Sequence, residues 1–407
     1  MSGGWQVPIS PRSRSWARGC VFLSAIAGLF GVAYAPERAW PNLLLDGFYT
    51  TSLAVSTMFF LATQRLTGAR WSASLRRIAE GFMLLMPSAA ALMLILFFGR
   101  HTLYSWSRPG AFANVVTIAG RVRYLQVPWM SARVTISLLL WVIFALLFRS
   151  VSLAQDQNPR QSLVLHHRLT RYSALFMPIF AVTFSLSAFD WLLSLDSQWF
   201  SSIFAVYVFA GTFVQGIAAI TLATVLLKEH GFLASSVGED QLHDLGTMLF
   251  AFSTFWAYIW TCQYLLIWYG NIPEEVTYYV RRTSGPWLCL FALNLIVNWV
   301  VPFVALLSVR TKRSSRVLKV ISILLLSGHW LDLYLLIMPS LWGTPKIGPF
   351  EIAIAAGYLA LIYLLLTGNL SQAALLPANE PVLAAPETCP SSPAHSHPLK
   401  FSGVEQE

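Results

Sequence analysis

Long apolar stretches recur along almost the whole chain, and short segments between them carry most of the charged residues. A stretch of about 20 apolar residues can cross the hydrocarbon core of a bilayer as an α-helix. The pattern predicts ten such helices, at about residues 18–34, 43–63, 79–98, 134–150, 174–195, 202–227, 246–270, 286–309, 317–338 and 350–368. The predicted fold is therefore an all-α integral membrane protein with a transmembrane domain over residues 18–368.

Composition supports a membrane location. The 407 residues are 56% hydrophobic and only 11% charged, whereas a soluble domain carries about 25% charged residues. The net charge of +9 comes from short basic clusters between the apolar stretches. Such clusters are typical of membrane topology signals, so we expect no nucleic-acid-binding surface.

The basic residues also predict orientation. If both termini lie on one side, that side holds about 18 Lys and Arg, against about 9 on the other. We therefore expect both termini in the cytoplasm. Residues 99–133, with Trp106 and Trp129, are predicted to form an external loop with a short interfacial helix. Residues 1–17 form a cytoplasmic arm, and the Pro-, Ala- and Ser-rich residues 369–407 form a disordered tail.

Motifs that would hold a cofactor or metal are absent from the sequence. None of Cys20, Cys262, Cys289 and Cys389 belongs to a CxxC pair, so neither a disulfide framework nor an iron–sulfur site is predicted. A cytochrome b-type haem needs paired histidines deep in facing helices, and only His329 is deep. Nucleotide and zinc-hydrolase motifs are also missing. His395 and His397 in the tail lack the further ligands of a metal site. We expect this chain to bind no cofactor, to hold no metal and to have no catalytic residues.

Ionisable residues inside apolar helices are the most informative positions. A charge near the bilayer centre costs about 2.5–3.5 kcal/mol on insertion scales, so such residues usually have a function. The clearest are Asp190, His329 and Asp332. His329 and Asp332 are three residues apart and share a helix face. An imidazole beside a carboxylate can pass a proton, but the same pair can also fix helix packing, and the sequence leaves both interpretations open.

The segment 244–275 has the most polar side chains of any predicted span. Ser253, Tyr258, Thr261 and Tyr264 are expected near one stripe that lines a hydrated path or binds a neighbouring helix. Acids at the helix ends, Asp46 and Asp196 outside among them, would admit protons. The resulting candidates for a proton path are Asp190, Asp332, His329, Glu274, Glu275, Tyr258, Tyr264, Asp244 and Glu80.

Several patches resemble one family of membrane subunits: LDGFYTTS at 45–52, residues 71–106, residues 187–211, residues 244–275 with IWYGNIPEE, and LDLYLLIMP at 331–339. They are similar to the F subunit of bacterial alternative complex III, a quinol:cytochrome c oxidoreductase, and to its NrfD/polysulfide-reductase-like relatives. The resemblance implies two four-helix bundles, about helices 2–5 and 6–9, flanked by the first and last helices. It also implies partner subunits that carry the cofactors: a multihaem cytochrome c, an iron–sulfur subunit and a sister NrfD-like subunit, with quinol or quinone nearby.

The resemblance favours one function among three. In it, this chain is a membrane subunit without a redox centre, which conducts protons while partner subunits oxidise quinol. Asp190, Asp332 and the Glu274/Glu275 pair match family patches and are the best relay positions. The alternatives are a structural anchor for extrinsic redox subunits, and a secondary transporter. Transporters often have matched pairs of broken helices, and no such pair is evident around Pro87, Pro178 or Pro302.

Overall fold

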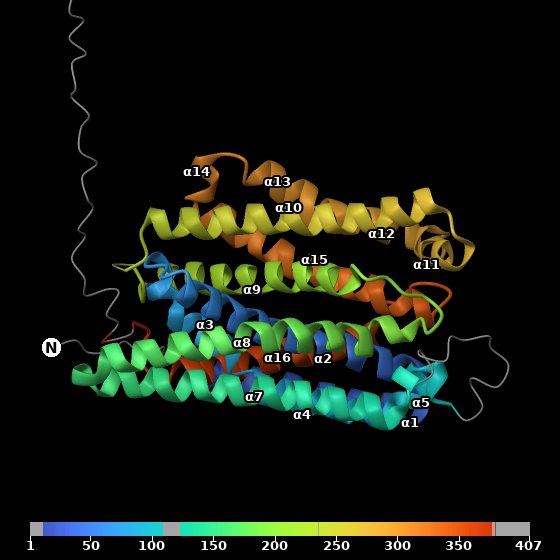
Figure 1. The fold of residues 1–407 in the computed structure, drawn as a ribbon, viewed down its shortest axis with the longest axis horizontal. Helices are drawn as coiled ribbons and strands as arrows, with labels where there is room; N and C mark the ends of the chain where they lie inside the picture. Colours follow the sequence, from blue (N-terminus) through green and yellow to red (C-terminus); the bar gives the residue numbers. More distant parts are fainter. Residues whose placement is uncertain (1–10, 109–122, 235, 377–378, 380–407) are drawn as a thin grey trace, which may run out of the picture.

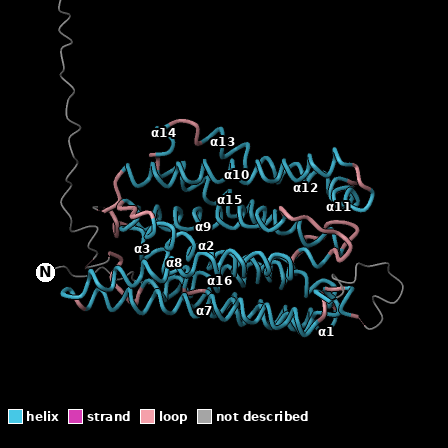
Figure 2. The backbone as a smooth tube through the Cα atoms, in the orientation of Figure 1, coloured by secondary structure: helices cyan, strands magenta, loops and turns pink. Residues whose placement is uncertain are grey.

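The computed structural model describes residues 11–108, 123–234, 236–376 and 379. These residues are almost entirely helical and contain no strand (Figure 2). The predicted disordered tail is wrong at its start, because Asn369 and Leu370 belong to a helix and Asn379 donates to the Asp156 carbonyl at 2.8 Å. The rest of the tail, with Cys389, His395 and His397, lies outside the described residues. Residues 1–10 of the predicted arm lie outside them as well.

All ten predicted spans are present among the described residues as helices long and apolar enough to cross a membrane. The sequence-based fold class is confirmed. The ten segments are Pro11–Tyr34 (α1), Pro36–Leu66 (α2), Trp71–Leu103 (α3 to α5), Val127–Gln157 (α7), Pro159–Leu195 (with α8), Phe204–Glu229 (α9), Glu239–Gly270 (α10), Trp287–Ala305 (α12 and α13), Ser315–Leu341 (α15) and Pro349–Leu370 (α16).

Two of these segments are interrupted helices, a third is extended by short turns, and two short helices connect spans. The third segment contains α3 (Arg76–Met83), α4 (Met86–Ile95) and α5 (Arg100–Leu103). The fifth contains α8 (Ser162–Trp191). The eighth contains α12 (Trp287–Leu295) and α13 (Val301–Ala305) around a π-helical turn at Ile296–Val300. The connecting helices are α11 (Pro273–Thr283) and α14 (Val309–Lys312).

The helices pack as two bundles that share an interface (Figure 1). The first bundle contains α2, the α3–α5 segment, α7 and α8. The second contains α9, α10, the α12–α13 segment and α15, and α2 packs on α9 and α15 between the two. The first and last helices, α1 and α16, pair with each other and lie against the first bundle. The predicted arrangement of two four-helix bundles with flanking helices is therefore present.

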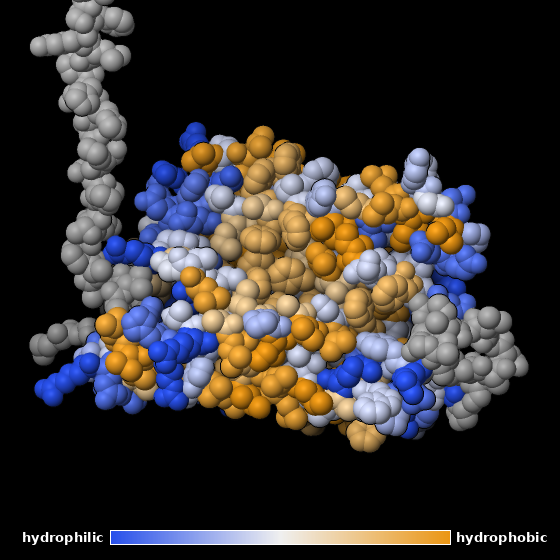
Figure 3. Space-filling model, viewed as in Figure 1, coloured by the Kyte–Doolittle hydropathy of each residue, from blue (hydrophilic) through white to orange (hydrophobic). Residues whose placement is uncertain are grey.

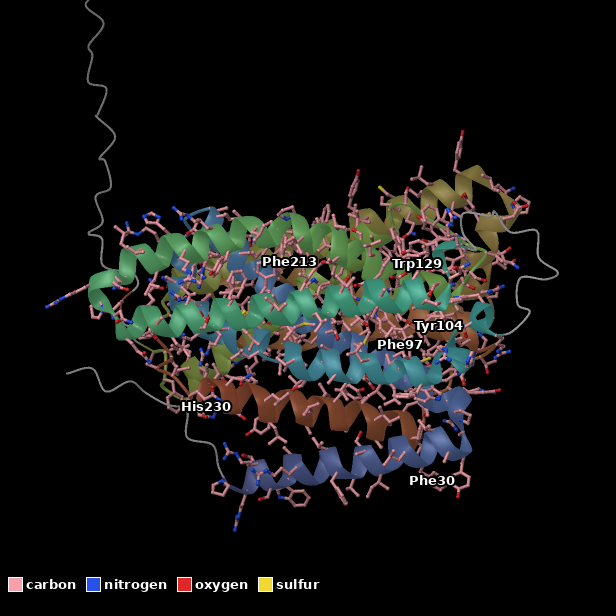
Figure 4. The ribbon with its side chains drawn as sticks, turned by 60° about the horizontal axis from the view of Figure 1, so that its bottom comes forward. Phe30, Phe97, Tyr104, Trp129, Phe213 and His230 are labelled. Atoms are coloured by element: carbon pink, nitrogen blue, oxygen red, sulfur yellow. The ribbon has the colours of Figure 1, made fainter. Side chains whose placement is uncertain are left out.

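The surface has the layout expected of a membrane protein. An apolar band crosses the middle of the molecule, and hydrophilic residues gather at its two ends (Figure 3). Tyr363 near the end of α16 donates a hydrogen bond to Ser13 near the start of α1, so both described termini lie at one end. We call this the termini end and the opposite end the α11 end. Figure 4 shows His230 at the termini end and Tyr104 with Trp129 at the α11 end.

Proline residues inside α2 and α15 leave carbonyl groups that side chains from other helices satisfy. A proline lacks the N–H that would bond the carbonyl four residues earlier. Pro41 frees the carbonyl of Glu37, which accepts a hydrogen bond from the Trp342 indole at 3.1 Å. Pro339 frees the carbonyl of Leu335, which accepts one from the Arg282 Nε at 3.0 Å. These bonds join helix ends at the α11 end.

The region 99–133 differs in part from the predicted external loop. α5 and α7 extend into it, and Trp106 is buried and donates its indole N–H to the Ser194 carbonyl at 3.0 Å. Trp129 is 60% exposed in the first turn of α7. The first span is also longer than predicted, since α1 begins at Pro11 inside the expected arm. The sequence analysis did not predict the connecting helix α11.

We expect Arg282→Ala to lower the stability of the folded protein by about 1–3 kcal/mol, because it leaves buried carbonyls without a donor. Arg282 is 3% exposed and also bonds Leu336 and Ser340. Thermal unfolding in detergent would measure the effect. Arg281→Ala is the matched control, since its side chain is 50% exposed and pairs only at the surface with Asp196. Equal effects of the two changes would contradict this explanation.

Candidate functional site

The carboxylate of Asp332 lies at the centre of the second bundle and contacts every helix of it. Asp332 is on α15 and accepts hydrogen bonds from Tyr207 of α9, from Trp256 of α10 at 3.1 Å and from Asn294 of α12 at 2.8 Å. All four side chains are buried. One acidic group is thus bonded by one donor from each of the other three helices. The sequence analysis identified Asp332 but none of these donors.

His329 lies one helical turn before Asp332 and is also buried. Neither ring nitrogen has a hydrogen-bond partner among the described residues. A side chain on Gly211 of α9 would come within 2.9 Å of the His329 Nδ1 and 3.3 Å of the Asp332 Oδ2. The two residues therefore share the predicted face, which packs on Gly211, but Asp332 is bonded by other residues rather than by His329.

The sequence analysis expected Asp46 at a helix end, but it lies inside α2. It is the eleventh residue of the helix, so it lies about 15 Å from the α11 end. Its Oδ1 accepts a hydrogen bond from the Trp330 indole at 2.9 Å, and its Oδ2 is buried without a partner. The sequence analysis placed Asp46 near a helix end because the predicted span began at residue 43. The helix in fact begins at Pro36, so Asp46 lies well inside it.

Buried hydroxyl groups follow Asp46 along α2 toward the termini end. Those of Thr50 and Thr57 lie on the same side of the helix as Asp46, and those of Ser52 and Ser56 lie on the side that packs on α9. Ser52 donates to the Gln215 side chain of α9 at 2.7 Å, and Gln215 donates to the backbone of α2. From Asp46 to Arg65 the helix rises about 28 Å at 1.5 Å per residue, close to the roughly 30 Å of a hydrocarbon core.

Glu80 lies near the termini end in a buried cluster of arginines. It accepts hydrogen bonds from Arg76 at 2.9 Å, Arg77 at 2.6 Å and Arg149 at 3.2 Å, and Arg65 lies 3.7 Å away. A buried carboxylate is stable when several charged donors surround it. The cluster joins α2, α3 and α7. The role of Glu80 in a proton path stays a prediction.

Asp190 is held in a two-pronged ion pair at the α11 end. Its carboxylate oxygens accept from Arg133 of α7 at 2.7 and 3.1 Å, and the guanidinium lies 3.8 Å from the centre of the Tyr124 ring. Such paired bonds fix geometry as well as charge. The structure thus connects α8 to α7 through the residue that the sequence analysis considered a relay.

The candidates on α10 and α11 do not join the Asp332 cluster. Tyr258 is 62% exposed on the outer surface, whereas Ser253 is fully buried, so the predicted polar stripe is wrong. Tyr264 packs among the rings of Trp260 and Tyr279. The remaining three lie at helix ends: exposed Glu274, half-buried Glu275, and Asp244 near His243.

The connecting helix α11 also contributes two buried tyrosines, Tyr278 and Tyr279, one turn after Glu274 and Glu275. Tyr278 stacks on Trp199 with ring centres 3.7 Å apart, and the Arg282 guanidinium lies 3.4 Å from the centre of the Tyr278 ring. Burial raises the pKa of the Tyr278 and Tyr279 hydroxyls above their usual value. Both therefore stay protonated at neutral pH and act as neutral packing groups.

Fold and site together define an all-α integral membrane protein with ionisable groups buried among the helices of two bundles. No protein-family model matches the chain, and no curated protein matches it either.

We expect Glu80→Gln to reduce the yield of folded protein strongly, with a loss of about 3–5 kcal/mol, because it removes the charge that several buried arginines share. Folded yield and thermal unfolding in detergent would measure it. Glu229→Gln is a matched control: its pair with Lys319 at 2.6 Å is partly exposed, and such pairs contribute about 0–1 kcal/mol. A Glu80→Gln protein as stable as the control would contradict the expectation.

Proposed function

We propose that this chain is an integral membrane subunit of a bacterial respiratory quinol:electron acceptor oxidoreductase of the alternative complex III type. It carries no redox centre, and it conducts protons while partner subunits oxidise quinol. The partners are a multihaem cytochrome c, an iron–sulfur subunit and a sister NrfD-like subunit. The protein lies in the inner membrane with both termini in the cytoplasm, so the α11 end faces outward.

The observation that carries the proposal is a group of buried ionisable side chains: Asp332 inside the second bundle, and His329 and Asp46 where α2 meets α15. Asp46, His329 and Asp332 are each at most 3% exposed, and such groups in a membrane are retained for function rather than for packing. The ring nitrogens of His329 have no partner in the described structure, so the imidazole is available to exchange a proton. No haem or cluster ligand set is needed on this chain for that role.

The hydroxyl groups on α2 support a route between the two ends. They continue from Asp46 to Thr57, over about 17 Å at 1.5 Å per residue, and Arg65 with the Glu80 cluster lies beyond them toward the termini end. Each hydroxyl can accept one proton and donate another. Glu80 at the termini end and Asp46 in the outer half are the acids at either limit of this route.

A structural anchor is the second candidate, and the ion pairs favour it. Asp190 with Arg133 and Glu80 with its arginines are tightly bonded at opposite ends of the first bundle. Groups held in this way lock helices together and need not exchange protons. The two functions differ in one measurable respect, because an anchor would tolerate neutralisation of Asp332.

We expect Asp332→Asn to leave assembly and quinol oxidation intact and to lower the ratio of protons moved to electrons transferred by at least about twofold, because it removes an ionisable group that a buried relay requires. The amide keeps the shape, and with its oxygen in the Oδ1 position it still accepts hydrogen bonds from Tyr207 and Asn294. Only the bond from Trp256 to the Oδ2 position is lost. The measurement is proton release by the native assembly in liposomes, after gentle purification with haem staining and identification of the accompanying subunits.

The matched control for this experiment is Asp240→Asn, since the Asp240 side chain is 87% exposed at the termini end. An unchanged ratio in Asp332→Asn would reject proton conduction through this residue and favour the anchor. A protein that purifies alone, without haem or iron–sulfur subunits, would reject membership of a respiratory complex.

A further inference from the structure

A pocket of about 500 Å³ lies between α2, α15 and α16 beside the residues discussed above. Its lining is mostly apolar and includes the aromatic side chains of Tyr49, Trp330 and Tyr358. Pockets of this size with an apolar lining and a few polar groups are the usual form of a small-molecule site. Neither the proton-path candidates nor the helix-locking ion pairs explain this space.

The pocket opens toward lipid. Ile323 of α15, Ile352 of α16 and Leu359 of α16 line it, and they are 49%, 60% and 59% exposed on the apolar surface of the bundle. Since these side chains face the hydrocarbon, a molecule can enter the pocket from the bilayer without passing through water. The ligand must therefore be lipid-soluble over most of its length.

Asp46 lines the pocket, and one of its two carboxylate oxygens has no hydrogen-bond partner among the described residues. Its Oδ1 already accepts from Trp330, whereas its Oδ2 is buried and has no partner. An unpartnered buried carboxylate oxygen costs free energy, and a hydroxyl from a ligand would remove that cost. The ligand should thus carry a hydrogen-bond donor at the end that enters first.

The other acid of the pocket cannot play this role. Glu351 accepts bonds from Arg38 at 2.7, 2.9 and 3.0 Å and from the backbone N–H of Gly348 at 2.9 Å. Both of its oxygens are therefore satisfied near the start of α16. This contrast leaves Asp46 as the acceptor to which a donor group can bind.

We propose that this pocket binds a quinol, whose ring hydroxyl donates to the Asp46 Oδ2 and whose apolar tail leaves between α15 and α16. The aromatic walls favour a flat ring over the hydroxyl of a glycerol lipid, because ring faces and edges pack well against each other. The inference rests on the proposed function for the choice of quinol. It extends that function, since it gives the quinol a binding site on this chain and not only on a partner.

The test is binding of a decyl benzoquinol to the full-length chain in lipid nanodiscs, measured by isothermal titration. We expect Asp46→Asn to raise the Kd of the quinol about tenfold, or about 1.4 kcal/mol, because the amide N–H₂ cannot accept the hydroxyl. Decyl benzoquinone has no hydroxyl to donate, and its carbonyl can accept from the amide N–H₂, so its binding should not weaken in this variant. Trp330 can still donate to the amide oxygen, which preserves the fold.

Two matched controls separate binding from general damage. Glu37→Gln makes the same kind of change at an exposed position of α2 outside the pocket and should leave the Kd unchanged. Ala355→Phe fills the pocket and should abolish binding of quinol and quinone, whereas Ala360→Phe, on the same helix but not in the lining, should not. Unchanged quinol binding in both Asp46→Asn and Ala355→Phe would overturn the proposal.

The remaining outcomes distinguish this inference from the function on which it rests. Tighter binding of dioleoylglycerol than of the quinol would overturn the choice of ligand and assign the pocket to a hydroxylated lipid. If the chain alone binds no quinol but the native assembly oxidises quinol normally, quinol binding in this pocket is rejected and the proposed function is retained. A native assembly that oxidises no quinol, with tight binding to this chain, would reject the function and retain the pocket.

Discussion

The second bundle depends on one buried carboxylate, that of Asp332. Hydrogen bonds from Tyr207, Trp256 and Asn294 bring three different helices to a fourth at a single point. In lipid, apolar side chains give little preference for one helix neighbour over another, so polar contacts and close packing specify the arrangement. Gly211 lets α9 and α15 approach closely here, since a larger residue would collide with His329. The carboxylate thus defines which helix faces meet.

The helix α2 connects this point to the rest of the molecule. It belongs to the first bundle, yet its hydroxyl-bearing face packs on α9 of the second. The same helix carries Asp46 beside the lipid-facing pocket, and its other end lies near the arginines around Glu80. A single helix therefore brings together the relay groups, the ligand pocket and the ion-paired cluster. In its most apolar 18-residue stretch 89% of the residues are buried, which is the highest share among the ten spans of the described residues.

The sequence predicts the spans well because hydrophobic length alone determines them, and the resemblance supplies the pairing into bundles. It predicts the site less well. Asp190, His329 and Asp332 stand out as charges in apolar helices, but their partners do not: Arg133 was assigned to a loop, and Asn294 is one polar residue in an apolar span. Tyr258 has the same composition signal as Tyr207, yet the first faces outward and the second bonds Asp332. Which side of a fully apolar helix faces a neighbour depends on tertiary packing, which periodicity cannot show when both sides are apolar.

The pairing of α1 with α16 has a consequence for the order of assembly. Ser24 donates to the carbonyl of Ile354, 330 residues away, and Gly357 has no side chain that would overlap Ser24. The ribosome makes α1 long before α16, so α1 must stay in lipid without this partner until α16 has been synthesised. Only 22% of the most apolar 18-residue stretch of α1 is buried even in the folded protein. During that interval its hydrophobic length and its contact with α2 hold it in the membrane.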